Sequence, residues 1–194
     1  MGGHEASLRE RKQQRARMEI VAAAYDLFEE RGYADVTVTD IAERAQVGRT
    51  TFFRYFGDKQ EVVFANEQDW LDGLQLPQSL SDKGKPGFGD AIALLRAVAE
   101  RICAAVTSDP ELYVRRERLL ADNPELEDRN ARKHRAFAER MRQLLAEQGA
   151  SSETAVLAPR LALACYYTGR ELAGGDPAAL WPNVAAAFDT IKWK

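Results

Sequence analysis

Residues 37–56 read TVTDIAERAQVGRTTFFRYF. Apolar residues recur at helical spacing in both halves of this stretch, at Val38 and Ile41 in the first and at Phe52 and Phe56 in the second. The letters QVG between the halves interrupt the periodicity. The pattern therefore predicts two short helices joined by a tight turn, which is the arrangement of a helix-turn-helix.

The second of these helices has two chemically different faces. Phe52 and Phe56 hold it from behind, which leaves polar and aromatic side chains outside. A major-groove recognition helix needs this division. Arg49 opens the helix, and its guanidinium can engage O6 and N7 of guanine. The structural alternative is a plain helical pair with an exposed polar face.

The flanking sequence predicts two further helices. One runs from Arg11 to Arg31, with Ile20, Leu27 and Phe28 on a shared apolar face. Gly32 is expected to end it in a left-handed conformation. The other begins after a capping residue, Asp58, and is expected to extend to about residue 74.

Thr37 is the expected start of the first helix-turn-helix element. Its hydroxyl can accept from the backbone N–H of Asp40, whose carboxylate can answer as a short capping box.

The N-terminal third resembles a known family. Residues 22–63, AAAYDLFEERGYADVTVTDIAERAQVGRTTFFRYFGDKQEVV, resemble the tetracycline-repressor (TetR) family of bacterial regulators. The resemblance implies an all-helical homodimer with a small DNA-binding domain and a larger effector-binding domain. It also implies which residues contact DNA: Thr39, Arg49, Thr50, Thr51, Phe53, Tyr55 and Lys59.

Two positions depart from the family pattern. The turn reads Gln46-Val47-Gly48 where the family often has Gly-Val-Ser, so Gly48 cannot cap the recognition helix with a side chain. Phe53 stands where tyrosine is common, so only apolar or stacking contact with DNA remains there.

Charge is unevenly distributed. The chain has a net charge of −3, which excludes a uniformly basic nucleic-acid binder. Residues 7–17 carry five basic side chains and one acidic side chain. Two interpretations stay open for this arm, residues 1–17: a solvated tail, or a segment that contacts phosphates.

Several function classes lack sequence support. Two cysteines and two histidines occur without metal-ligand spacing, so neither a disulfide framework nor a metal site is expected. No catalytic set, phosphate loop or cofactor motif is present, so an enzyme is not expected. His134, within the run RKHR, is interpreted as part of a solvated face. No apolar run approaches the roughly 20 residues of a membrane span, and cytoplasmic residence is expected.

The remainder of the chain is predicted to be helical throughout. A loop at 75–89 precedes about five helices, which brings the expected total to about nine in an all-α fold. The predicted domains are residues 1–60, with the helix-turn-helix, and 61–194, for effector binding and dimerisation. Three helices are expected to start at a cap residue followed by proline: Asp109-Pro110, Asn123-Pro124 and Asp176-Pro177. Pro159 and Pro182 lie inside helical patterns, so a kink or delayed start is expected at each.

The last two helices are rich in small residues, which together with the resemblance predicts a four-helix interface between two copies. The expected interface residues are Leu161, Cys165, Leu172, Leu180, Val184 and Phe188. Packing within one chain is the alternative. The expected residues of a ligand pocket among the middle helices are Ile102, Val106, Tyr113, Leu119, Phe137, Met141, Tyr166 and Tyr167.

Arginines are dense between residues 115 and 142. They form either a solvated face paired with acidic neighbours or a site for an anionic ligand. Residues 110–148 loosely resemble regulators of the same family that bind acyl-CoA-like ligands. The sequence therefore predicts a transcriptional repressor that binds double-stranded DNA at a palindromic operator. It is expected to leave the operator when a small hydrophobic or amphipathic effector binds.

Overall fold

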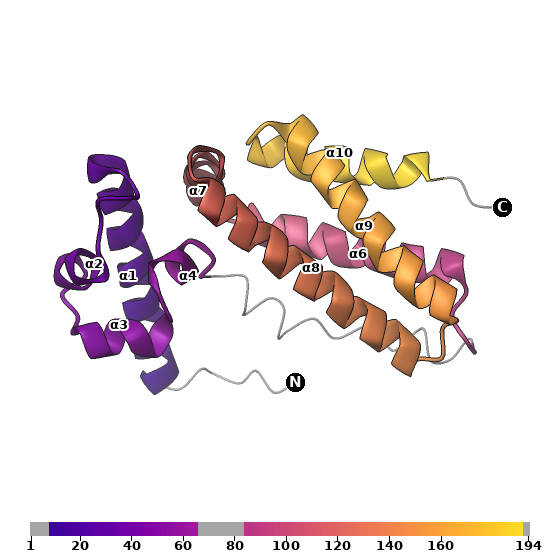
Figure 1. The fold of residues 1–194 in the computed structure, drawn as a ribbon, viewed down its shortest axis with the longest axis horizontal. Helices are drawn as coiled ribbons and strands as arrows, with labels where there is room; N and C mark the ends of the chain where they lie inside the picture. Colours follow the sequence, from indigo (N-terminus) through magenta and orange to yellow (C-terminus); the bar gives the residue numbers. More distant parts are fainter. Residues whose placement is uncertain (1–7, 66–83, 192–194) are drawn as a thin grey trace. The chain divides into compact units, whose positions relative to one another are not determined.

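The structure is a computed structural model that describes residues 8–65 and 84–191. These residues form nine helices and no strand, which confirms the predicted all-α class (Figure 1). The helices are α1 (Leu8–Arg31), α2 (Val38–Arg44), α3 (Arg49–Tyr55), α4 (Lys59–Val63), α6 (Phe88–Val106), α7 (Pro110–Asp122), α8 (Pro124–Glu147), α9 (Ser152–Ala173) and α10 (Pro177–Thr190).

The chain divides into two compact units between Ala65 and Asn66, close to the predicted boundary after residue 60. The first unit holds α1 to α4 and the second holds α6 to α10. α4 ends at Val63, earlier than the sequence pattern suggested, and Phe64 and Ala65 form a turn after it. The rest of its predicted length, residues 66–74, lies outside the described residues. Most of the predicted loop at 75–89 lies outside them too, and α6 begins within it at Phe88.

α1 forms the centre of the first unit. Its predicted apolar face is buried, and α1 contacts both α2 and α4. Ile41 of α2, Phe52 of α3 and Val62 of α4 are each 0% exposed. Burying a side chain of this size contributes about 1.5–3 kcal/mol. The Tyr25 hydroxyl donates to the Val63 carbonyl at 3.3 Å, which ties α1 to α4.

A capping box begins α2, and a tight turn joins it to α3. Thr37 and Asp40 form the predicted capping box at the start of α2. After α2, Gln46 adopts a left-handed conformation with φ of 54°. The Val47 N–H then donates to the Ala42 carbonyl at 2.9 Å, which closes the turn. Gly48 precedes α3 without a side-chain cap, as its identity predicts.

α9 is the central helix of the second unit and contacts α6, α8 and α10. It crosses α10 closely at Gly169. A Cβ atom at that position would lie 2.4 Å from the backbone nitrogen of Val184, closer than real Cβ atoms approach. The absent side chain therefore allows the two helices to meet at this distance.

The predicted proline starts are confirmed for α7, α8 and α10. The Asp109 and Asp176 side chains accept from backbone N–H groups of their helices, at 3.0 and 2.8 Å. Asn123 differs, because its side chain donates to the Leu119 carbonyl at the end of α7. α9 and α10 run through Pro159 and Pro182, and neither helix starts late.

Candidate nucleic-acid interface and ligand cavity

α3 has one buried face and one exposed face. Phe52 is 0% exposed and Phe56 3% exposed, and their rings lie 5.6 Å apart. Arg49 and Thr50, in the first turn of α3, are exposed, and Phe53 is 47% exposed. The burial of the two phenylalanines confirms the prediction that they hold the helix from behind.

The remaining predicted DNA-contacting residues have mixed environments. Thr51 and Tyr55 on α3 and Thr39 on α2 are half-buried. The Lys59 ammonium donates to the Tyr33 carbonyl at 2.7 Å and lies 4.1 Å from the Tyr33 ring centroid. Lys59 therefore already serves a contact inside the chain, and phosphate binding by it stays a prediction.

The start of α2 is held by polar contacts around Asp40. Its carboxylate accepts from the Thr37 backbone and hydroxyl, and the Arg31 guanidinium pairs with it at 3.1 Å. The hydrogen bonds from Thr37, followed by that from Arg31, lower the pKa of Asp40 to about 2. Asp40 therefore stays ionised at neutral pH, which keeps the capping box formed.

The basic N-terminal segment is helical from residue 8 onward, so this part is not an extended tail. Arg15 pairs with Glu19 at 2.8 Å one turn along α1. The Arg17 guanidinium carbon lies 5.8 Å from the centroid of the Phe56 ring. α1 thus brings part of the predicted basic arm next to the C-terminal end of α3.

The second unit contains a mostly apolar cavity with a volume of about 70 Å³ between α6, α8 and α9. Four of the predicted pocket residues line it: Ile102, Phe137, Met141 and Tyr166. Val106, Tyr113, Leu119 and Tyr167 are not among its lining residues, so a role for them in ligand binding stays a prediction. Tyr113 is buried in the core and is only 2% exposed.

His134 lines the cavity, although the sequence pattern had assigned it to a solvated face. Its ring packs edge-on against Tyr166, with centroids 5.1 Å apart, and its Nδ1 lies 3.2 Å from the Tyr167 hydroxyl. The spacing of His134, Phe137 and Met141 puts all three on one face of α8. That spacing was the available signal, and the adjacent basic residues obscured it.

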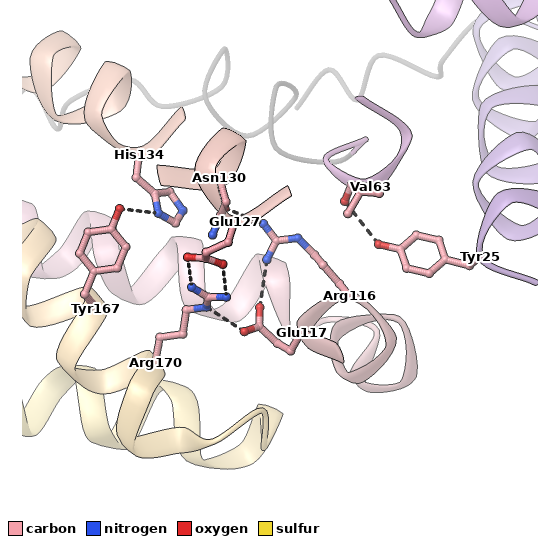
Figure 2. A network of polar contacts seen from close by, with 9 residues as sticks. All are labelled: Tyr25, Val63, Arg116, Glu117, Glu127, Asn130, His134, Tyr167 and Arg170. Atoms are coloured by element: carbon pink, nitrogen blue, oxygen red, sulfur yellow. Dashed lines mark hydrogen bonds and ion pairs between the residues drawn. The ribbon is translucent and has the colours of Figure 1, made fainter. Parts of the chain in front are cut away.

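A network of ion pairs joins α7, α8 and α9 beside His134 (Figure 2). The Arg170 guanidinium donates to Glu117 at 2.7 Å and to both carboxylate oxygens of Glu127, at 2.9 and 3.0 Å. Arg116 donates to Glu117 at 3.1 Å and to the Asn130 side-chain oxygen at 3.2 Å.

The network shows how arginines of this region pair with acidic side chains. Burial alone would raise the pKa of Glu127, but hydrogen bonds and charge from Arg170 outweigh it and hold that pKa below its usual value. Arg142 likewise pairs with Glu139. Where partners are resolved, the arginines of this region thus follow the predicted acidic pairing rather than forming an open anion site.

A second cleft lies between α7, α8 and α9, with a volume of about 840 Å³. It is larger than the apolar cavity, but it is shallow and open, and Glu117, Glu127 and Arg170 in its lining already bind one another. Tyr167 lines this cleft. The smaller cavity is the better candidate for a small molecule, because its lining is mostly apolar, as that of ligand sites usually is.

The comparisons with known proteins concern mainly the first unit. Residues 20–65 match the family model described as bacterial regulatory proteins of the tetR family. These residues are a TetR-family domain.

Two bacterial regulators share sequence with the TetR-family domain and its surroundings. The regulator HbdR of Aromatoleum sp. (strain CIB) is 32% identical over 92 residues, covering 46% of this chain and 35% of that protein. The regulator TcmR of Streptomyces glaucescens is 38% identical over 73 residues, covering 36% and 32%. The chain thus matches about a third of the length of these relatives.

A solved structure extends the likeness to the whole fold. The SmeT–triclosan complex superposes with a TM-score of 0.58 at 22% identity, covering 91% of this chain and 89% of SmeT. The TetR-family domain and the helical second unit therefore occur together in a known fold.

The predicted interface residues, all in the second unit, fall into two groups. Leu180, Val184 and Phe188, at most 2% exposed, and Cys165, 5% exposed, belong to the chain's own core. They offer no surface to a partner, so the interface prediction is corrected for these four. Leu172 is 67% exposed, and Leu161 is half-buried.

The part of the chain that the structure describes lacks both a membrane-spanning helix and a metal-binding cluster. None of its helices combines the length and apolar character needed to cross a bilayer. Residues 8–65 and 84–191 contain no group of three or more His, Cys, Asp or Glu side chains arranged to hold a metal ion.

Proposed function

We propose that this chain is a sequence-specific DNA-binding transcriptional regulator. The observation that carries the proposal is the two-faced α3, with Phe52 and Phe56 buried and Arg49, Thr50 and Phe53 exposed. The TetR-family domain around α3 supports the same function. In this proposal Arg49 reads a base edge, while Thr39, Thr50, Thr51, Tyr55 and Lys59 contact bases or phosphates and Phe53 makes apolar contact.

We propose that the active form is a homodimer joined through α9. Its outer side carries a stripe of small and apolar side chains on one helical face, the α9 stripe: Leu157, Leu161, Ala164, Thr168 and Leu172. Leu157 and Leu172 are 42% and 67% exposed, which favours a surface covered by a second copy. A two-fold dimer that presents its recognition helices about 34–36 Å apart binds a palindromic operator.

The proposed effector is a small hydrophobic or amphipathic molecule in the apolar cavity. Ligand sites usually measure about 300–1,000 Å³, so a cavity of about 70 Å³ must widen when it is filled. The acyl-CoA-like ligand implied by residues 110–148 would need more room and free cationic groups. Because Arg116, Arg142 and Arg170 are engaged with acidic partners, a smaller effector is favoured.

The proposed mechanism is repression relieved by the effector, in the bacterial cytoplasm. An effector shifts the DNA-binding equilibrium only through its different affinity for the two states of the dimer. A ten- to hundredfold weakening of operator binding corresponds to about 1.4–2.7 kcal/mol of coupling.

Selection of bound sequences from randomised double-stranded DNA tests the function. The full chain is expected to enrich a palindrome and to bind it at least about 10³ times more tightly than random DNA. Affinity is expected to fall steeply between 50 and 200 mM salt, because phosphate contacts release counterions. Enrichment of no sequence, with equal affinity for all DNA, would contradict a specific regulator and favour a nonspecific DNA-coating protein.

A further inference from the structure

The apolar cavity has a small and specific polar component. Among its twelve lining residues, only His134 and Tyr166 carry a side-chain nitrogen or oxygen atom. The two rings meet edge to face, with centroids 5.1 Å apart and planes at 78°. Both polar side chains therefore lie on neighbouring parts of the cavity wall.

His134 is held in the neutral state. Its pKa is lowered to about 3, first by burial and then by the positive charges of Arg116 and Arg170. A neutral imidazole has one N–H and one acceptor nitrogen. Since the Nδ1 atom lies 3.2 Å from the Tyr167 hydroxyl, Nε2 is the atom left for a ligand.

The Tyr166 hydroxyl is also uncharged and has no hydrogen-bond partner among the described residues. Burial raises its pKa well above the usual value, so it stays a phenol. The hydroxyl is therefore available to donate a hydrogen bond to a ligand or to accept one from it.

We propose that this cavity binds a compact, uncharged aromatic molecule with one hydroxyl group, hydrogen-bonded to His134 and Tyr166. The proposal rests on the effector role proposed above and names its chemical class. The Phe137 and Tyr166 rings offer edge and face contacts to a flat ligand, and the Met141 sulfur is suited to an aromatic ring edge. A hydroxyl both donates and accepts, so it fits either tautomer of His134.

Size favours a single ring. An engineered apolar cavity of about 150 Å³ binds benzene. The present volume of about 70 Å³ is roughly half of that, so modest movement of flexible walls admits one ring. Met141 has three rotatable side-chain bonds and can supply such movement.

Analogues of this ligand with a charged group in place of the hydroxyl are disfavoured. A ligand ammonium would meet the same positive potential from Arg116 and Arg170 that opposes a proton on His134. A carboxylate would be attracted by that potential, but it would lose its hydration beside two uncharged partners, because both guanidiniums already donate to Glu117, Glu127 and Asn130. The hydroxyl is the polar group that fits.

Calorimetric titration of the full chain, without DNA, tests the proposal. The probes share one ring and differ in one group: 4-methylphenol, toluene, 4-methylbenzylamine and 4-methylbenzoate. We expect 4-methylphenol to bind at least about tenfold more tightly than toluene, and the two charged probes to bind more weakly than toluene. A preference for the amine or the carboxylate, or no binding of 4-methylphenol, would overturn the proposal.

Two variants connect the preference to the named groups. His134→Phe and Tyr166→Phe are each expected to reduce the advantage of 4-methylphenol over toluene to less than about threefold. Tyr113→Phe is the matched control, because it removes a buried hydroxyl that does not line the cavity. Equal advantages in all three variants would overturn the assignment.

A measurement on the unmodified chain covers the case in which the variants fail to fold. The sequence has two histidines, His4 and His134, so selective ¹³C labelling gives two imidazole signals. 4-Methylphenol is expected to shift the His134 signal and not that of His4. Absence of a shift at saturation would overturn the site. Ligand binding that leaves operator affinity unchanged would contradict the effector part of the proposed function and keep the site.

Discussion

Two aromatic side chains determine which face of α3 is buried. Phe52 and Phe56 pack inward next to one another, and Arg49 is exposed in the first turn of the same helix. The sequence was sufficient to predict this, because large apolar residues four apart in a short helix have few places to go besides a core.

Replacing Arg49 with alanine tests its proposed base contact. The variant is expected to lose about 1–3 kcal/mol of discrimination at one base pair of each half-site, because a bidentate contact with guanine is removed. Competition between the selected operator and single-base variants measures this. Arg101→Ala is the control, since Arg101 is exposed on α6 in the second unit. An unchanged base preference in Arg49→Ala would contradict the assignment.

His134 makes stability depend on pH. The unfolded chain binds the His134 proton near pH 6.5, whereas the folded-state pKa is about 3. Between these values the unfolded state binds more protons, so lowering the pH reduces stability by up to about 1.4 kcal/mol per pH unit. Arg116, Arg170 and Glu127 face the imidazole, and the two arginines outweigh the carboxylate.

Urea unfolding at pH 7 and pH 5 measures this dependence. His134→Gln is expected to lose less stability over this interval than the unmodified chain, because glutamine does not titrate. Both proteins retain the acid sensitivity of their carboxylates, including Glu127, so only the difference between them reports on His134. Identical pH dependence would mean that the imidazole is not held neutral.

At the scale of single residues, the prediction of burial failed where a side chain that packs inside the protein has charged neighbours in sequence. His134 lies among three basic neighbours and was assigned to the surface, yet its ring packs against Tyr166 and Tyr167. The sequence also could not predict which arginine pairs with which carboxylate. Arg170 and Glu117 are far apart in sequence and are brought together only by the packing of α7 and α9.

Helix ends were predictable because their chemistry is local. The Thr37 capping box, the Asp58 cap and the proline starts of α7 and α10 each depend on residues a few positions apart. Prolines inside helices were less predictable. α9 runs through Pro159 because packing against α6, α8 and α10 compensates for the lost hydrogen bond.

The α9–α10 crossing predicts an unusual response to alanine. Alanine normally favours a helix over glycine by about 1 kcal/mol, but a Cβ at position 169 would lie 2.4 Å from the Val184 backbone. Gly169→Ala is therefore expected to lower the free energy of unfolding by about 1–3 kcal/mol, because the helices must separate. Gly57→Ala is the control, since a Cβ there has no neighbour within 4 Å. A stabilised Gly169→Ala variant would contradict the close crossing.

At the scale of the whole molecule, the class and the two-part organisation followed from helical periodicity and from the loop-like composition between the units. The division between core and interface did not. Helices with small residues on several faces fit both roles, and periodicity cannot say which face a neighbouring helix covers. Of the residues predicted for the interface, Leu180 and Val184 therefore proved to be core residues, whereas Leu172 is exposed.

The α9 stripe predicts the oligomeric state. Leu172→Arg is expected to convert the dimer to a monomer, because it buries an unpaired charge in each half of the proposed interface. Light scattering coupled to size-exclusion chromatography measures the mass. Met18→Arg is the control, because Met18 is 63% exposed on α1 and Leu172 is 67% exposed on α9. A monomeric unmodified chain, or a Leu172→Arg dimer of equal strength, would contradict the interface.

The left-handed Gln46 restricts which amino acids the turn can accept. This conformation costs a residue with a side chain about 1–2 kcal/mol, and β-branched residues tolerate it worst. Gln46→Gly is expected to raise the melting temperature slightly and Gln46→Val to lower it, as thermal unfolding can measure. Natural variation at this position should therefore run through glycine and asparagine, and random mutagenesis should rarely recover valine or isoleucine there.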